Sequence, residues 1–352
     1  MNNFYNLIYY PRFKFYPKFT TNELETKEIQ ELISIWKKII PNTDVDNNVD
    51  KEEWIENALL LLKATKKYKP ENIYVKFASK PGYFVLNNRK RIIQEEVYEL
   101  ENVIVLGSTN IMQLTKFKNL IEPTINDIQK AESYFKFNTF FKYANRKCYI
   151  GSFREDNQNW RKVLNKLPDG NYIVKTCSQK YLPLFIYEVK DGVGKFKDFL
   201  NIYGYSNEKE MHTDIISQIG YAGIHMEGEK YGLLIQEYTK MNYEYRFIVK
   251  NQEIISGAGC VEEFTPLDRR SPNICDYQIR KNRLLGTDII EDKEKVHIMH
   301  RYAQDVVNAL KIEDDKFTNY IVDIALNENN EPLLVEINPF LNYGFYANKV
   351  IV

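Results

Sequence analysis

A stretch near the C-terminus places charged side chains inside two strongly apolar segments. Residues 320–326 and 333–337 are rich in Ile, Val, Leu and Ala, and the sequence Asn-Glu-Asn-Asn-Glu-Pro between them has the composition of a turn. Three polar side chains interrupt this pattern: Asp323, Glu336 and Asn338. The flanking residues predict strands that are buried on both faces. Carboxylates in such strands need a cation or hydrogen-bond partners.

The spacing of these three residues predicts a cation site. Glu336 and Asn338 are two positions apart, so a strand directs them to the same face. If the strands pair about the Asn329-Asn330 turn, Asp323 lies opposite Glu336. Two carboxylates and a carboxamide form the oxygen-only set that Mg²⁺ prefers, and Mg²⁺ takes its remaining ligands from water or nucleotide phosphates. The alternative is a surface hairpin whose polar side chains face water.

Two upstream segments also carry charged residues. In residues 172–176 the apolar run is interrupted by Lys175. Such a lysine either faces water on the polar side of its strand or offsets the charge of a phosphate. Residues 243–259 predict a hairpin in which Glu244 and Arg246, two positions apart, share a face. They form either a surface cross-strand pair or, through the arginine fork, part of an anion site.

The order of these motifs resembles the ATP-grasp superfamily. Over about residues 136–345, the chain has a lysine-bearing strand, an apolar strand at 232–240, a Glu-x-Arg hairpin, a helix at 291–311, and then Asp and Glu-x-Asn-Pro. The resemblance implies an α/β (α+β) fold in which two mixed sheet-and-helix subdomains grip ATP, after a smaller α/β N-terminal domain. The implied divisions are 1–121 for the N-terminal domain, 122–240 for the lysine-bearing subdomain and 241–352 for the metal-binding subdomain.

The resemblance also implies ATP and Mg²⁺ as cofactors. It assigns the metal to Asp323, Glu336 and Asn338, between the β- and γ-phosphates. It assigns catalysis to Lys175 and Arg246, which would contact phosphate or acylphosphate oxygens. Arg283 is added as a candidate contact for a substrate carboxylate or phosphate.

The cofactor-binding residues implied by the resemblance are Lys142, Lys175, Gln236, Glu237, Tyr238 and Glu244. Lys142, with Lys147 close behind, is the best candidate for a second phosphate-binding lysine. Backbone atoms of residues 236–238 would read the adenine edge. Glu237 or a nearby carboxylate would hold the ribose hydroxyls.

Local patterns predict the remaining elements. Strands are expected at residues 4–10, 72–77, 82–86 and 102–107, and helices at residues 23–40 and 51–66. A helix is expected to begin near Pro123, where a proline suits the first turn. Residues 140–143 and 148–151 predict a strand, a turn and a strand, and residues 159–167 predict an amphipathic helix.

The composition limits the compartment and the partners. The 352 residues include 48 Lys plus Arg and 48 Asp plus Glu, so no global basic field attracts nucleic acid or an anionic membrane. The four cysteines lack metal-binding spacing and read as reduced thiols. No apolar run approaches the length of a membrane span, and no signal peptide is evident. We therefore expect a cytoplasmic protein without nucleic acid or membrane partners, and the resemblance adds a homodimer.

The resemblance implies a carboxylate–amine ligase. In that family ATP converts a carboxylate into an acylphosphate, and an amine displaces phosphate to form an amide. This chemistry depends on charge neutralisation and positioning, which fits a chain without a Ser/His or Cys/His constellation. The expected acceptor is a small molecule, a peptide or a protein. One alternative is an ATP-grasp kinase acting on a small-molecule hydroxyl. Another is a non-catalytic nucleotide-binding regulatory protein, which the Gly-poor residues 177–180 favour and the intact metal set opposes.

Overall fold

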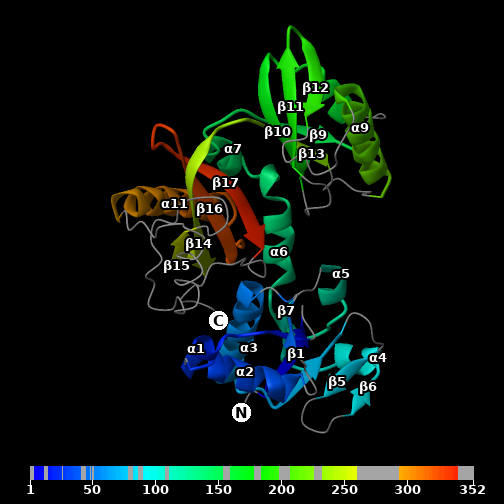
Figure 1. Ribbon diagram of the computed structural model, residues 1–352, viewed down its shortest axis with the longest axis vertical. Coiled ribbons are helices and arrows are strands. Elements are labelled where there is room, and N and C mark those ends of the chain that lie inside the picture. The colour runs from blue at the N-terminus through cyan, green and yellow to red at the C-terminus, as the bar shows by residue number, and fades with distance from the viewer. Residues whose placement is uncertain are drawn as a thin grey trace.

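The protein contains three principal sheets. The computed structural model describes residues 4–11, 15–25, 27–40, 45–47, 49, 51–77, 82–85, 90–107, 111–153, 159–177, 184–197, 207–225, 232–259 and 293–339. Along the longest axis, the sheet that contains β14 to β17 lies between the other two (Figure 1). The α/β class predicted from the sequence is confirmed. Among the described helices, none is long and apolar enough to cross a membrane.

The N-terminal sheet has six strands in the order β6-β5-β4-β1-β7-β8. They are β6 (Arg91–Ile92), β5 (Tyr83–Val85), β4 (Asn72–Val75), β1 (Asn6–Tyr10), β7 (Val103–Gly107) and β8 (Leu120–Glu122). β1 runs parallel to β4 and β7, β7 runs parallel to β8, and β4, β5 and β6 pair antiparallel. A separate parallel pair joins β2 (Tyr16–Pro17) and β3 (Val45–Asp46).

Two helices cover the core of this N-terminal part. The helices of the part are α1 (Thr21–Leu24), α2 (Lys27–Ile39), α3 (Lys51–Tyr68), α4 (Gln94–Tyr98) and α5 (Ile111–Leu114). The apolar stripe of α2 meets that of α3 through Trp36 and Trp54, whose ring centroids are 5.3 Å apart. Both indoles are completely buried. The helices and strands predicted here are confirmed, with boundaries shifted by a few residues.

The five-stranded sheet has the order β12-β11-β10-β13-β9 and is antiparallel throughout. Its strands are β9 (Cys148–Ser152), β10 (Gly170–Thr176), β11 (Phe185–Lys190), β12 (Val193–Lys197) and β13 (Gly232–Glu237). Helices α8 (Asn159–Leu164) and α9 (Glu208–His225) bury one face in a cluster that includes Trp160, Val174 and Ile215. Because strand residues alternate between faces, Lys175 lies on the other face.

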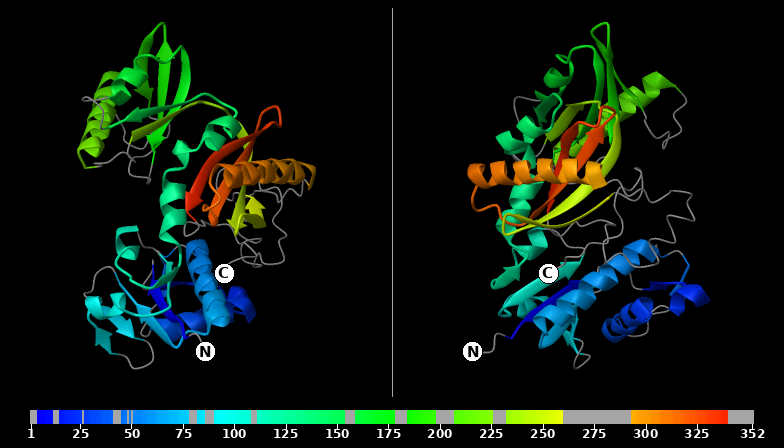
Figure 2. Two further views of the ribbon diagram at one scale, coloured as in Figure 1. Left: turned by 180° about the vertical axis from the view of Figure 1, so that it is seen from behind. Right: turned by 90° about the vertical axis from the view of Figure 1, so that its left-hand side faces the viewer.

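The four-stranded sheet has the order β15-β14-β16-β17. Its strands are β14 (Met241–Lys250), β15 (Glu253–Gly259), β16 (Tyr320–Asn327) and β17 (Pro332–Pro339). Helix α11 (Lys293–Glu313) crosses one face (Figure 2) and packs on it through residues such as Met299 and Val306. On the opposite face, Ile248 and Ile321 join the apolar cluster of α2 and α3. The N-terminal part therefore packs on the sheet face that is not covered by α11.

The strand predicted at residues 140–143 is wrong. The connection between the N-terminal and five-stranded sheets contains α6 (Ile125–Glu132), the short 3₁₀ helix η1 (Tyr134–Lys136) and α7 (Asn138–Tyr143). Phe140 is buried in the α11 core, whereas Phe141 is partly exposed. The Glu313 carboxylate accepts hydrogen bonds from the first amides of α7, those of Asn138 at 2.7 Å and Thr139 at 2.9 Å. This distant acidic cap stabilises the helix start against the strand preference of an aromatic run.

Candidate active site

The β16–β17 hairpin brings the three predicted metal ligands together. Asp323 pairs with Glu336 in the antiparallel register, as the sequence predicts. The Asn338 amide nitrogen donates to Asp323 Oδ2 and to Glu336 Oε1, both at 2.9 Å. The turn after Asn327 fixes this register, because the Asn327 side-chain oxygen accepts from the amides of Asn329 and Glu331, both at 2.9 Å.

Arg246 forms a two-pronged ion pair with Asp323. It lies directly opposite Asp323 on the neighbouring strand β14. Its Nε donates to Oδ1 at 2.7 Å and its Nη2 donates to Oδ2 at 2.6 Å. The Asp323 side chain is fully buried and that of Arg246 is 8% exposed. The two hydrogen bonds from the guanidinium hold this buried carboxylate in a fixed orientation.

Lys175 connects the five-stranded sheet to the four-stranded sheet. Its Nζ lies 2.9 Å from Glu336 Oε2, and both side chains are about four-fifths buried. Burial alone would lower the pKa of Lys175, but the Glu336 carboxylate and the Tyr134 hydroxyl raise it above its usual value. Lys175 is therefore a permanent cation at neutral pH.

Arg146 is a further cation of the cluster that sequence reasoning missed. It lies just before β9, and its Nε and Nη2 donate to the side-chain oxygen of Gln236 at 3.2 and 2.9 Å when that amide is oriented to satisfy both groups. Its Nη1 is buried without a hydrogen-bond partner among the described residues. Burial lowers the pKa of Arg146, while Cys148, Tyr134 and Glu336 raise it in part. A buried guanidinium nitrogen without an acceptor favours an anionic ligand at this position.

Tyr134 and the two described cysteines complete the surroundings. Burial raises the pKa of Tyr134 to about 12, so its hydroxyl stays protonated beside Lys175. That hydroxyl has no hydrogen-bond partner of good geometry within the described part of the chain. Burial also raises the pKa of Cys148, and that of Cys177 to about 12. Both cysteines are therefore neutral thiols and poor nucleophiles.

Lys142 does not join this cluster. It lies exposed on helix α7, and its Nζ stacks 5.0 Å from the ring centroid of the neighbouring Tyr143. The resemblance implied Lys142 as a second phosphate-binding lysine, and the helix places it at the surface. Arg146, three residues beyond the end of α7, is the cation of this segment that lies beside Gln236.

The predicted base-reading strand contributes one buried side chain. On β13, Gln236 is 3% exposed and lies on the Lys175 face, whereas Glu237 alternates to the other face and is exposed. The Glu237 amide donates to Lys147 O and the Tyr238 amide to Asn171 O, both at 2.8 Å. These two backbone amides therefore donate to neighbouring backbone carbonyls and are not free to bind a nucleotide base. The Glu237 carboxylate lies on the face of β13 opposite Gln236 and Lys175.

Glu244 retains the position that the sequence predicted for it. It precedes Arg246 by two residues on β14 and pairs with Ala325 of β16, so the two side chains share a face. Glu244 is the carboxylate of β14, two positions before Arg246. The remaining predicted residue, Arg283, lies outside the described residues.

The donor set of this cluster fits Mg²⁺ with a nucleotide. The described residues contain no group of three His, Cys, Asp or Glu side chains that could hold a metal. A metal ion held by Asp323 and Glu336 would therefore need the Asn338 side-chain oxygen as a third ligand, a set that suits Mg²⁺ better than zinc. Lys175, Arg246 and Arg146 are the cationic side chains that would face the phosphate oxygens of a nucleotide bound there.

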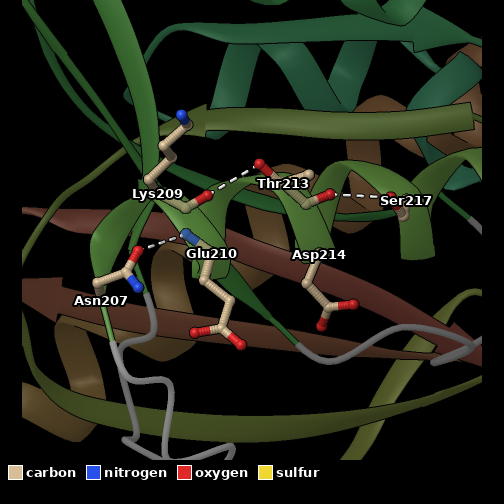
Figure 3. A pocket seen from close by; sticks show the side chains of 6 residues that line it. All are labelled: Asn207, Lys209, Glu210, Thr213, Asp214 and Ser217. Atoms are coloured by element: carbon tan, nitrogen blue, oxygen red, sulfur yellow. Dashed lines mark hydrogen bonds between the residues drawn. The ribbon is translucent and has the colours of Figure 1, made fainter.

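A pocket on α9 is separate from this cluster. It is lined by Asn207, Lys209, Glu210, Thr213, Asp214 and Ser217 (Figure 3). Several of its polar groups are engaged within the helix: Thr213 donates to Lys209 O and Ser217 to Thr213 O, both at 2.9 Å. None of the charged residues described above lines it, so we do not assign it to the active site.

Comparison with known proteins gives similarity at the level of structure. No protein-family model and no curated protein sequence matches the chain. The D-alanyl-alanine synthetase A of Vibrio cholerae overlaps 96% of this chain and 89% of its own, with 8% identity and a TM-score of 0.46. The D-alanine-D-alanine ligase of Aeromonas hydrophila overlaps 96% of this chain and 90% of its own, with 14% identity and a TM-score of 0.42. An ATP-grasp RimK domain protein of Sphaerobacter thermophilus overlaps 85% of this chain and 90% of its own, with 10% identity and a TM-score of 0.43.

The structures that resemble the fold of this chain over most of its length thus include a D-alanyl-alanine synthetase, a D-alanine-D-alanine ligase and an ATP-grasp RimK domain protein. The identities lie between 8% and 14%. The chemistry of this chain must therefore be inferred from its own charged cluster.

Proposed function

We propose that the protein is an ATP-dependent carboxylate–amine ligase that activates a carboxylate as an acylphosphate. The observation that carries the proposal is the contact between two sheets at Lys175 and Glu336, beside the Arg246–Asp323 pair and Asn338. Two buried carboxylates, an amide and converging cations form the constellation that a metal–triphosphate complex requires.

Asp323, Glu336 and Asn338 would hold Mg²⁺, which when bound neutralises phosphate charge and orients the γ-phosphoryl group. Lys175 and Arg246 contact phosphate oxygens, and the planar fork of Arg246 suits two oxygens of the group in transfer. Arg146 offers its unpartnered Nη1 to a further anionic oxygen. Together these residues hold the phosphoryl donor in line with the substrate carboxylate and stabilise the charge of the transition state.

The nucleoside lies along β13 and β14 in this proposal. Gln236 is the buried polar side chain of β13 beside Arg146, and Glu244 is the carboxylate on the face of Arg246. Glu244 therefore replaces Glu237 as our candidate for the ribose hydroxyls. The neutral thiols of the half-buried Cys148 and the buried Cys177 agree with a reaction that needs no protein nucleophile.

The acceptor is an amino acid, a peptide or a protein amine in this proposal, and Arg283 is a candidate contact for its carboxylate. We propose that residues 1–121 limit the acceptor site, with residues 122–240 and 241–352 forming the two nucleotide-gripping subdomains. Ile248 and Ile321 support this division, because they lie on the Arg246 face of the four-stranded sheet and pack with α2 and α3. A cytoplasmic location and a homodimer remain parts of the proposal.

Trapping with hydroxylamine tests the reaction. The protein is incubated with Mg·ATP, panels of amino acids and dipeptides, and hydroxylamine, which converts an acylphosphate into a hydroxamate. We expect hydroxamate and ADP in equal amounts, and loss of both in Glu336→Gln. Glu328→Gln is the matched control, because it makes the same change at an exposed ion pair on the β16–β17 turn. A stable phosphate ester without hydroxamate would identify a kinase, and nucleotide binding without turnover would identify a regulatory protein.

A further inference from the structure

The proposed metal ligands are fully engaged by protein groups. Asp323 uses both carboxylate oxygens in hydrogen bonds with Arg246. Glu336 receives Lys175 at one oxygen and the Asn338 amide at the other. Asn338 directs its nitrogen, not its oxygen, between the two carboxylates. In this arrangement the amide nitrogen occupies a place where a metal ion would need an oxygen ligand.

Both carboxylates of the cluster are already paired with cations of the protein. Arg246 and Lys175 compensate Asp323 and Glu336, and Arg146 adds another buried cation. A divalent cation that approaches this arrangement meets no uncompensated carboxylate. An anion with several oxygens meets three cationic side chains, one of which has a nitrogen without an acceptor.

From these two observations we infer that Arg246 and Lys175 act as counter-ions that keep the metal ligands closed until nucleotide phosphates draw the two cations away. The inference rests on the proposed function, and it concerns the order in which nucleotide and metal bind. Phosphate oxygens replace carboxylate oxygens as acceptors for Arg246 and Lys175. Asp323 and Glu336 would then lack these cations, and with the Asn338 amide turned to present its oxygen the three side chains would hold the metal.

The exchange makes the two ligands strongly cooperative. If nucleotide raises the affinity of the protein for the metal by some factor, the metal raises the affinity for the nucleotide by the same factor. We expect the affinity of the metal site to rise on the order of 100-fold with nucleotide, within the range usual for two coupled sites. We also expect the nucleotide to bind measurably without metal, because its cationic contacts need none.

Binding of Mn²⁺ in place of Mg²⁺ tests the exchange without any turnover. Electron paramagnetic resonance measures free and protein-bound Mn²⁺ with the full chain, in the absence and presence of a non-hydrolysable ATP analogue. Calorimetry in EDTA measures the analogue alone. For the wild-type protein we expect no Mn²⁺ binding at sub-millimolar concentration without analogue, binding of the analogue in EDTA, and a protein-bound Mn²⁺ signal when both are present.

Variants that remove a counter-ion should gain metal binding. Arg246→Gln leaves Asp323 without its cation, so Mn²⁺ should bind to this variant without nucleotide. Lys175→Gln should do the same at Glu336 and serves if Arg246→Gln does not fold. Lys240→Gln is the matched control, because it removes a lysine from the exposed pair with Glu328, and it should bind no Mn²⁺ alone.

Two results overturn the inference in distinguishable ways. If nucleotide-free wild-type protein binds Mn²⁺ as tightly as the nucleotide complex does, the counter-ion role is wrong while the nucleotide site stands. If the analogue binds neither in EDTA nor with Mn²⁺, the proposed function fails and the exchange fails with it. Absence of gain in both Arg246→Gln and Lys175→Gln, with both variants folded, also contradicts the role of these residues.

Discussion

Breaking the Arg246–Asp323 pair should destabilise the four-stranded sheet. The Asp323 side chain is 0% exposed and that of Arg246 is 8% exposed, so solvent screens the pair very little. Asp323→Asn keeps the shape of the side chain but replaces the charged acceptor of the buried guanidinium by a neutral one. Removing one partner of a buried pair costs about 3–5 kcal/mol, most of it from the charge that remains.

A double replacement separates the cost of the lone charge from the value of the pair. Arg246→Met with Asp323→Leu fills a similar volume without any charge. Such replacements are often neutral or stabilising, so we expect the double variant to be within about 1 kcal/mol of the wild type. Asp323→Asn alone should lower the free energy of unfolding by about 3 kcal/mol. The pair is therefore predicted to be kept for binding anions and metal and not for stability.

Amide hydrogen exchange at β14 and β16 is the appropriate assay, because it reports on this sheet and not on the separate N-terminal and five-stranded sheets. A loss of about 3 kcal/mol corresponds to exchange roughly 100-fold faster in peptides from these strands. Peptides from β11 and β12 serve as an internal control, because their core cluster contains no residue of β14 or β16. The reasoning is refuted if Asp323→Asn changes protection less than tenfold, or if the double variant is as unprotected as Asp323→Asn.

Three further predictions follow from the described contacts. Mg·ATP at about 100 times its dissociation constant should stabilise the protein by about 2.7 kcal/mol in thermal unfolding, and the part of this gain that requires Mg²⁺ should vanish in Glu336→Gln. Arg146→Gln should weaken nucleotide binding by about 10- to 100-fold in calorimetry, as for the loss of a charged hydrogen bond, whereas Lys142→Gln on the helix surface should leave it unchanged. Glu313 has a lowered pKa, because hydrogen bonds from the start of α7 outweigh the opposite effect of burial. Its stabilisation of α7 should be present at neutral pH and lost as the pH falls through that lowered pKa, below about 4.3, and Glu313→Gln should remove this pH dependence in circular dichroism.

The residues that sequence analysis placed correctly lie on strands with strong local patterns. Asp323 and Glu336 were predicted to face each other because the residues of the turn between them allow only a narrow choice of register. Glu244 and Arg246 were placed on one face by the two-residue period of a strand. The same period places Glu237 on the face opposite the buried Gln236.

Arg146 shows what a sequence pattern cannot supply. It lies between α7 and β9 in a short polar segment with no periodicity, so nothing local distinguishes it from Lys142 or Lys147. Its role follows from the pairing of β9 with β13, which sets it beside Gln236, and from Glu313, which starts α7 and turns Lys142 towards solvent. Both causes come from residues about 90 to 170 positions away.

The ion pairs made by Asp323 and Glu336 also come from residues far away in the sequence. Sequence spacing identified an acidic and amide set that needs a cation, and it left the identity of that cation to inference. The fold supplies two cations from the protein itself, one from β14 and one from β10 of the other sheet. Because Lys175 reaches Glu336 across the two sheets, a ligand that recruits Lys175 acts on the contact between the sheets as well as on the metal site. Nucleotide binding should therefore change hydrogen exchange in β10 and β17 together, and a change confined to either strand would contradict this coupling.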